Sequence, residues 1–301
     1  MTRILLLGAG GQVGREIAAL ATERAVPLTA LDRAGVDITD TDAIARALDT
    51  HQPDIVINAA AYTAVDKAES EAAQATLINA TAPGLIASAC ARHGAALIHI
   101  STDYVFDGTK AGPYVESDPI APLGVYGASK AAGETAVRDA LDRHLIVRTA
   151  WVYGAYGNNF LKTMLRLAND RDRLTIVADQ RGCPTATRDI AEALLTAADA
   201  LKGDAAKAGT YHLAGTGVTT WFDFAREIIA QSARHTGRQP VMVPITTADY
   251  PTPARRPANS ELSSELFAQT FGFRAAPWQQ RVVEVVDELA YLNRRPIESA
   301  S

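Results

Sequence analysis

The chain of 301 residues is long enough for one large domain or two modest domains with a substantial core. Hydrophobic residues make up 48% of it and charged residues 21%, a balance typical of soluble globular proteins and not of disordered ones. Its formal net charge of −5 gives no electrostatic reason to expect nucleic acid or an anionic membrane as a partner. Composition therefore argues against both of these partner classes.

The cysteines and the start of the chain indicate a compartment. Only two cysteines occur, Cys90 and Cys183, and neither has the spacing of a metal ligand, so a reduced cytosolic compartment is the simplest interpretation. The apolar run at residues 4–7 ends at Gly8 and is too short for the core of a signal peptide. No stretch approaches the roughly 20 apolar residues that a membrane span needs. We therefore expect a cytoplasmic protein.

Apolar, strand-like runs alternate with amphipathic, helix-like stretches through the first half of the chain. Strands are expected at residues 4–7, 28–31, 55–58, 96–100 and 146–148, and helices at residues 13–24, 42–50, 69–93 and 125–141. Alternation of this kind predicts βαβ units and a parallel sheet covered by helices on both faces. The predicted fold class is therefore α/β, with a doubly wound parallel sheet.

A glycine-rich turn joins the first expected strand to the first expected helix. Its glycines, Gly8, Gly11 and Gly14, permit a tight turn, close approach of the backbone to a pyrophosphate, and close packing of helix on sheet. The N-terminus of the following helix supplies amide donors and the positive end of a dipole to phosphates. We therefore predict dinucleotide binding at this turn, in preference to an ordinary strand-to-helix connection.

The end of the second expected strand bears on the choice of dinucleotide. Asp32 lies near the offset at which an acidic residue binds the ribose 2′-hydroxyl of NAD. Arg33 follows at once and could accept the 2′-phosphate of NADP. Asp32 could also be a plain turn residue. The choice between NADH and NADPH therefore stays open.

The alternation of strands and helices weakens after Trp151. Residues 151–159 are rich in Gly, Tyr and Asn, which favours a binding loop; a helical period returns at 188–201. Prolines gather at residues 244–257, with Pro240 slightly earlier, which predicts that 244–257 is extended and irregular. We expect residues 1–150 to form a dinucleotide-binding domain, with part of 185–215 returning to it. Residues 151–301 are expected to form mainly a smaller, discontinuous substrate-binding lobe.

Tyr126 and Lys130 follow the strand that ends in Ser101-Thr102-Asp103, and their spacing of four places both on one helix face. A phenol is a poor acid at neutral pH, but an adjacent cation favours the phenolate and lowers its pKa. Such a tuned acid could deliver a proton to a carbonyl oxygen that Thr102 holds by a hydrogen bond. Each residue alone could be an ordinary surface side chain. Their joint occurrence with the glycine turn predicts a reductase site.

With these residues assembled, the chain resembles the extended short-chain dehydrogenase/reductase superfamily, and within it the dTDP-4-dehydrorhamnose reductases. The matching stretches are GAGGQVGRE (8–16), NAAAYTAVDKAES (58–70), INATAP (78–83), STDYVFDG (101–108), VYGASKAAGE (125–134), RTAWVYG (148–154) and RRPANSEL (255–262). They extend over nearly the whole chain. The resemblance implies a Rossmann-like sheet with a smaller C-terminal substrate-binding lobe.

The resemblance also implies reduction of the 4-keto group of dTDP-4-dehydro-L-rhamnose by NADPH or NADH. Tyr126 would donate the proton, Lys130 would bind the nicotinamide ribose and lower the pKa of Tyr126, and Thr102 would bind the carbonyl. The cofactor would lie against Gly8, Gly11, Gln12, Val13, Gly14, Asp32, Arg33, Asp37, Ile38, Ala60, Ala61, Tyr62 and Lys130. The nucleotide-sugar substrate would contact Thr102, Asp103, Tyr126, Trp151 and Arg256, with Asn79 supporting the site.

Two of these contacts have plain alternatives. Trp151 could simply fill the core, an outcome that we weigh about equally with ligand contact. Arg256, with Arg255, could be a solvated charge or could grip a diphosphate through bidentate hydrogen bonds. We favour the diphosphate because the pair stands in an expected irregular segment.

Local departures from related enzymes narrow the expectation. Tyr104 stands where sugar-nucleotide 4,6-dehydratases of this superfamily have a glutamate that eliminates water, so the resemblance favours simple reduction. Some family members form a dimer bridged by a metal through glutamates, one of which Glu16 could match. Arg188 stands where another such glutamate is expected, so Mg²⁺ is not carried over. Mg²⁺ is therefore possible but not supported by the sequence, no metal ligand is assigned, and a monomer or homodimer is expected.

Two rival functions remain from the sequence. One is a sugar-nucleotide epimerase that keeps a tightly held NAD and needs no added reductant. The other is a non-catalytic regulatory subunit that binds dinucleotide, like the β subunit of methionine adenosyltransferase. The presence of Thr102, Tyr126 and Lys130 argues against the second, because a pure binding subunit has no need of all three.

Overall fold

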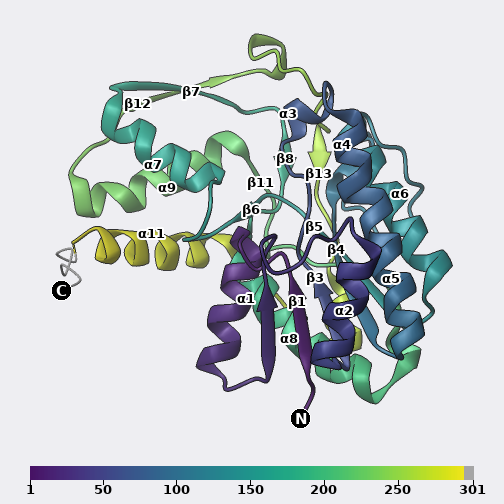
Figure 1. The fold of residues 1–301 in the computed structure, drawn as a ribbon. Helices are drawn as coiled ribbons and strands as arrows, with labels where there is room; N and C mark the ends of the chain where they lie inside the picture. Colours follow the sequence, from purple (N-terminus) through teal and green to yellow (C-terminus); the bar gives the residue numbers. More distant parts are fainter. Residues whose placement is uncertain (295–301) are drawn as a thin grey trace.

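The computed structural model describes residues 1–294, and a six-stranded parallel sheet forms its centre (Figure 1). In order across the sheet the strands are β10 (Gly209–His212), β5 (His144–Thr149), β4 (Ala96–Thr102), β3 (Ile55–Asn58), β1 (Ile4–Leu7) and β2 (Leu28–Leu31). The strand order reverses at β1, which is where α/β sheets bind ligands. The predicted α/β class with a parallel sheet is confirmed.

Helices cover both faces of the sheet, as strands buried on two sides require (Figure 1). One face carries α1 (Gln12–Glu23) and α8 (Thr187–Gly203), and the other carries α2 (Thr41–His51), α5 (Ala82–His93) and α6 (Val125–Ala140). The side chains of β1 alternate accordingly. Leu6 belongs to the core beneath α1 and α8, whereas Leu5 and Leu7 belong to the core beneath α2 and α5.

The helix predicted at residues 69–93 is confirmed from Ala72 onward, but it starts three residues later than expected and contains a π-helical turn. The structure has α3 (Val65–Ala68), then α4 (Ala72–Thr76), a π-helical turn at Leu77–Thr81, and α5. The carbonyl of Asn79 lies so close to α6 that a Cβ on Gly133 would be 2.0 Å from its oxygen. π turns of this kind widen a helix locally and are frequent at functional sites. This one places the Asn79 side chain against Tyr62 and Ser129.

A smaller lobe is built from the second half of the chain. Its helices α7 (Phe160–Asp170), α9 (Trp221–Thr236) and α11 (Trp278–Arg294) pack around a core that includes Phe224. Its small sheets pair β7 (Arg173–Val177) with β12 (Val241–Ile245), β6 (Val152–Tyr153) with β9 (Thr185–Ala186), and β8 (Arg181–Gly182) with β11 (Thr219–Thr220) and β13 (Asn259–Ser260). The short α10 (Glu265–Phe271) packs against β10 of the central sheet.

The segment predicted to be irregular at residues 244–257 is wrong only at its first two residues, which end a regular strand. Residues 241–245 form β12, which pairs in parallel with β7 even though it contains Pro244. Because β12 has a partner only in β7, Pro244 removes no hydrogen bond from a central strand. A 3₁₀ turn, Thr247–Asp249, follows the strand. The division of the chain into two domains near residue 150 stays a prediction.

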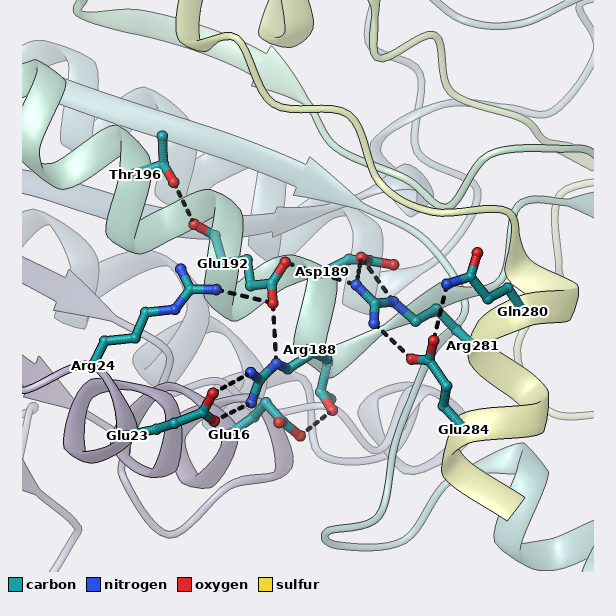
Figure 2. A network of polar contacts seen from close by, with 11 residues as sticks. Glu16, Glu23, Arg24, Arg188, Asp189, Glu192, Thr196, Gln280, Arg281 and Glu284 are labelled. Atoms are coloured by element: carbon teal, nitrogen blue, oxygen red, sulfur yellow. Dashed lines mark hydrogen bonds and ion pairs between the residues drawn. The ribbon is translucent and has the colours of Figure 1, made fainter. Parts of the chain in front are cut away.

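A network of ion pairs joins α1, α8 and α11 (Figure 2). Arg188 of α8 donates two hydrogen bonds, of 2.8 and 2.9 Å, to Glu23 of α1. Asp189 of α8 is 1% exposed and accepts hydrogen bonds of 2.7 and 3.0 Å from Arg281 of α11. Arg188 therefore acts as an ion-pair partner. Within residues 1–294 no cluster of three or more His, Cys, Asp or Glu side chains is arranged to hold a metal ion.

Candidate active site

A cavity of about 910 Å³ lies at the carboxyl ends of β1, β3 and β4, with residues of the smaller lobe on its far wall. The predicted site residues that line it are Gly8, Gly11, Gln12, Val13, Asp32, Arg33, Asp37, Ile38, Ala60, Ala61, Thr102, Asp103, Tyr126, Lys130 and Trp151. The cavity therefore brings the glycine turn and the Tyr126–Lys130 pair to one place.

Three predicted site residues lie outside the lining of this cavity. Gly14 lies beneath the glycine turn. Tyr62 donates its backbone N–H to Asn79 Oδ1 over 2.8 Å. The Arg256 guanidinium is occupied by Asp66, with Nη2 2.9 Å from Oδ2. Direct ligand contact by Tyr62 and Arg256 stays a prediction.

The glycine turn has the shape that a bound pyrophosphate needs. Gly8 has a φ of +83°, and a Cβ there would lie 2.5 Å from the backbone nitrogen of Ala60. A Cβ on Gly14 would lie 2.2 Å from the Gly8 carbonyl oxygen. Gly11 occupies the N-cap of α1 and offers no side chain to cap it, so the amide donors of the first turn have no capping side chain, and Gln12 and Val13 line the cavity. The turn therefore fits a diphosphate at a helix N-terminus.

The acidic residues beside β2 are bound to their own loops. Asp32 Oδ1 accepts hydrogen bonds from the N–H groups of Ala34 and Gly35, over 3.0 and 3.1 Å. Asp37 Oδ1 accepts from the N–H and hydroxyl of Thr39, bonds that lower the pKa of its carboxyl. Asp32 thus fulfils its turn role while it also lines the cavity.

Tyr126 lies in the first turn of α6, whose start is fixed by a distant side chain. Glu69 Oε1 accepts a hydrogen bond of 2.9 Å from the N–H of Val125 and so caps the helix. The ring of Tyr104 meets the Tyr126 ring edge to face, with centroids 5.5 Å apart. These contacts aim the Tyr126 ring into the cavity, which it lines together with Thr102 at the end of β4.

The pKa of Tyr126 differs from the expectation drawn from its spacing to Lys130. Burial raises the pKa of Tyr126 to about 12, a hydrogen bond with Thr102 acts in the opposite direction, and the charge of Asp103 raises it further. The expected net lowering by Lys130 is therefore wrong for the protein alone, because desolvation of the phenolate outweighs any favourable charge.

Lys130 is almost completely buried, at 1% exposure. Its Nζ donates a hydrogen bond of 2.7 Å to the carbonyl oxygen of Ile100 and lies 3.2 Å from Nε2 of His99. Burial lowers the pKa of Lys130 to about 8, although the charge of Glu134 acts to raise it. A lysine in this environment changes its charge close to physiological pH.

Asp103 is the second titratable group beside Thr102. It is 3% exposed and accepts a hydrogen bond of 3.0 Å from the Thr102 hydroxyl. Burial raises the pKa of Asp103 to about 6, against the effect of hydrogen bonds from Ser260 and Thr102. Asp103 therefore titrates closer to neutral pH than an ordinary aspartate.

Trp221 and Phe160 are cavity residues that the sequence did not reveal. Trp221, at the start of α9, stacks on Trp151 with ring centroids 3.6 Å apart and planes 10° apart. Phe160 packs against Trp221 at 4.6 Å. Trp151 has a φ of +48° and both packs and lines the cavity, so the two interpretations of it are compatible. Since these aromatics are far apart in the sequence, no local pattern joins them.

A loop of the smaller lobe reaches the glycine turn. Asn159 Nδ2 donates to Gln12 Oε1 over 3.4 Å and to the Gly154 carbonyl over 2.8 Å. Gly157 has a φ of +65°, and a Cβ there would lie 3.0 Å from Gln12 Cβ. The loop that precedes α7 is therefore in contact with the first turn of α1.

Comparison with known proteins agrees with this geometry. Residues 1–291 match the family model of the RmlD substrate binding domain. The chain is 45% identical to dTDP-4-dehydrorhamnose reductase of Aggregatibacter actinomycetemcomitans (95% of this chain, 98% of that protein) and 46% identical to that of Burkholderia thailandensis (95% and 99%). A crystal structure of dTDP-4-dehydrorhamnose reductase from Bacillus anthracis in complex with NADP is 35% identical, with a TM-score of 0.87, over 95% of this chain and 99% of that one. The chain belongs to the dTDP-4-dehydrorhamnose reductase family.

Proposed function

We propose that this protein reduces the 4-keto group of dTDP-4-dehydro-L-rhamnose to give dTDP-L-rhamnose, with NADPH or NADH as reductant. The observation that carries the proposal is the convergence of Thr102, Tyr126 and Lys130 on the cavity that also contains the glycine turn. Family membership supports the choice of sugar, because relatives at 45% and 46% identity carry the reductase name over nearly their whole length.

The chain's own residues provide a place for the nicotinamide dinucleotide, which supplies hydride when it is bound. Gly8, Gly11 and the open N-terminus of α1 would bind the diphosphate. Asp32 would bind the 2′-hydroxyl of the adenosine ribose in NADH, or Arg33 would bind its 2′-phosphate in NADPH. Lys130 would bind the other ribose from the floor of the cavity. Support for NADPH comes from a relative crystallised with NADP.

Tyr126 and Thr102 would act on the carbonyl oxygen. Both side chains line the cavity and a hydrogen bond joins Tyr126 to Thr102, so both hydroxyls could bond the same carbonyl oxygen. The alkoxide form of that oxygen would be a stronger base than a phenolate whose conjugate acid has a pKa of about 12. The Tyr126 proton would therefore move to the oxygen, and the ammonium form of Lys130 would stabilise the phenolate that remains.

The smaller lobe would hold the nucleotide sugar against this wall. Trp151 and Trp221 form a stacked apolar surface in the cavity, which would exclude water from the reacting carbon. Arg256 lies nearby on its Asp66 partner, where it could exchange that carboxylate for a substrate phosphate. We further propose a cytoplasmic enzyme, which acts as a monomer or homodimer. None of the described helices is long and apolar enough to cross a membrane.

The first test follows the absorbance of NADPH, and separately of NADH, with the dTDP-4-keto-6-deoxy sugar made in situ by the dehydratase and epimerase that precede it. Oxidation that requires both upstream enzymes is expected, and the two initial rates rank the cofactors. Cofactor binding without oxidation would instead support a regulatory subunit. Interconversion of sugars with no added reductant would support an epimerase.

The role of Tyr126 is tested by Tyr126→Phe, which removes only the hydroxyl. We expect cofactor binding to persist and turnover to fall by about 10²–10⁴-fold, the usual contribution of a positioned proton donor. Tyr211→Phe is the matched control, because Tyr211 lies on β10 at the edge of the sheet and its hydroxyl bonds the Lys207 carbonyl. Unchanged turnover in Tyr126→Phe would show that another group supplies the proton.

A further inference from the structure

A buried chain of hydrogen bonds runs from the backbone beside the cavity to Lys130. Its first member is Asn58, the last residue of β3, which is 0% exposed. Asn58 Oδ1 accepts a hydrogen bond of 3.1 Å from the N–H of Ala60, which fixes the orientation of the amide. The amide nitrogen, Nδ2, then faces Nδ1 of His99 over 3.1 Å. Because Nδ2 can only donate, Nδ1 of His99 must accept.

His99 lies on β4 and is completely buried. Burial and the charge of Lys130 hold the pKa of His99 well below its usual range, so the ring is neutral at pH 7. A neutral imidazole has one N–H, and with Nδ1 engaged as an acceptor that proton resides on Nε2. The Nε2–H group points to Lys130 Nζ, which is 3.2 Å away.

This arrangement does not suit a charged lysine. An ammonium group has three donors and no acceptor, so it would meet Nε2–H as donor against donor. A neutral amine has a lone pair that can accept from Nε2–H, while one of its own N–H groups still donates to the Ile100 carbonyl over 2.7 Å. The network is fully satisfied only when Lys130 is uncharged.

We propose that His99 is a positioning residue that, with its proton held on Nε2 by Asn58, favours the neutral amine of Lys130. Other titratable groups near Lys130 are Tyr126 and Glu134 on its own helix α6, and Asp103, which follows β4 and lines the same cavity. Glu134 favours the charged form, but its carboxylate is shared with Arg148 of β5 over 2.7 Å. His99, from β4, is therefore the neighbour that opposes the charge.

The consequence for catalysis rests on the proposed function, whereas the protonation states of His99 and Lys130 do not. If charged Lys130 stabilises the Tyr126 phenolate, kcat/KM falls as pH rises through the pKa of Lys130. Burial lowers the pKa of Lys130 to about 8, and the donor on the Asn58–His99 pair would act in the same direction as burial. Removal of the Nε2 donor moves the limit to higher pH, because the ammonium form then meets no opposing donor.

The direct test is nitrogen NMR of the whole protein with ¹⁵N-labelled histidine and lysine at pH 7. We expect His99 to carry its proton on Nε2 and to leave Nδ1 unprotonated, and Lys130 to titrate close to pH 8. Protonation of Nδ1, or a cationic ring, would overturn the proposal whatever the enzyme proves to reduce. This measurement needs no variant and no substrate.

Two variants separate the proposed role from simple packing. His99→Asn keeps an acceptor for Asn58, at the place of Nδ1, and removes the donor to Lys130. The Lys130 titration and the basic limb of kcat/KM should both rise by about one pH unit. Asn58→Asp keeps the oxygen that accepts from the N–H of Ala60, but replaces the amide donor that faces His99 with a second acceptor. The proton of the His99 ring should therefore move to Nδ1. An unchanged Lys130 titration in His99→Asn would refute the role.

The matched control is His144→Asn, because the Nδ1 of His144 bonds the Leu141 carbonyl at the start of β5, away from the cavity. Its pH profile should be that of the parent protein. A loss of activity in His99→Asn with no shift of the basic limb would indicate packing alone. If the parent protein and all variants fail to reduce the keto sugar while His99 still carries its proton on Nε2, the proposed substrate is rejected. The proposed role of His99 is then retained.

Discussion

The ion pair between Asp189 and Arg281 is the place where one substitution should separate charge from packing. Arg281→Met keeps much of the side-chain volume on α11 and removes the cation. Asp189 is 1% exposed, and its Oδ2 already has no hydrogen-bond partner in residues 1–294. Burial raises the pKa of Asp189, and Arg281 is the main group that opposes the rise. Without Arg281, a buried carboxylate is left uncompensated.

The cost of this change has an upper limit, because the carboxyl can take up a proton. The ordinary pKa of the Asp189 carboxyl, 3.8, lies about 3 pH units below pH 7. At 1.36 kcal/mol for each unit, the free energy needed to protonate it at pH 7 is about 4 kcal/mol. At pH 5 the same step costs only about 1.6 kcal/mol. A carboxyl with a raised folded-state pKa destabilises most above that pKa, so the difference between the parent and Arg281→Met should shrink as the pH falls.

The assay is urea denaturation followed by circular dichroism at pH 7 and pH 5. We expect Arg281→Met to lose about 3–4 kcal/mol at pH 7 and less than about 2 kcal/mol at pH 5. Adding Asp189→Asn should recover most of the loss at pH 7. Arg226→Met is the control, because that arginine is 67% exposed and its pair with Asp223 contributes under about 1 kcal/mol. An equal loss at both pH values would refute the explanation by buried charge.

Three further substitutions test the site. Gly14→Ala places a Cβ 2.2 Å from a carbonyl oxygen of the glycine turn, and should weaken NADPH binding about tenfold or more in a fluorescence titration. Asn79→Ala removes the partners of the Tyr62 backbone and should lower the free energy of unfolding by about 1–3 kcal/mol in urea; an unchanged midpoint would contradict this. Trp221→Ala removes the stack on Trp151 and should raise KM for the nucleotide sugar about tenfold, with cofactor affinity nearly constant.

Much of the central sheet could be predicted because its signals are local. The apolar runs at residues 4–7, 28–31 and 55–58 are strands with the bounds that the pattern indicated. The glycine turn and the Tyr126–Lys130 spacing likewise reside in short segments, and both line the cavity as expected. Short-range chemistry was therefore sufficient to locate the site on the fold.

Features that depend on distant contacts could not be predicted. The π turn at Leu77–Thr81 packs closely against Gly133 of another helix, a contact that the local sequence does not reveal. The stacking of Trp221 on Trp151 joins segments with no shared pattern. The pKa of Tyr126 was misjudged because spacing shows the neighbouring cation but not the degree of burial. In each instance the sequence shows the residue but not the side chains and backbone that surround it in the fold.

The hydrogen bond from Asn159 to Gln12 joins the two halves of the proposed site. Gln12 begins the helix that would bind the cofactor diphosphate, and Asn159 caps α7 in the smaller lobe. The cofactor would therefore bind beside Gln12, and the sugar nucleotide would bind on the side of Asn159. Thermodynamic linkage then requires the two effects to be equal. If bound cofactor changes the affinity for the sugar nucleotide by some factor, bound sugar nucleotide changes the affinity for the cofactor by the same factor. The order in which the two ligands bind would change the pathway to the ternary complex, but not its total free energy.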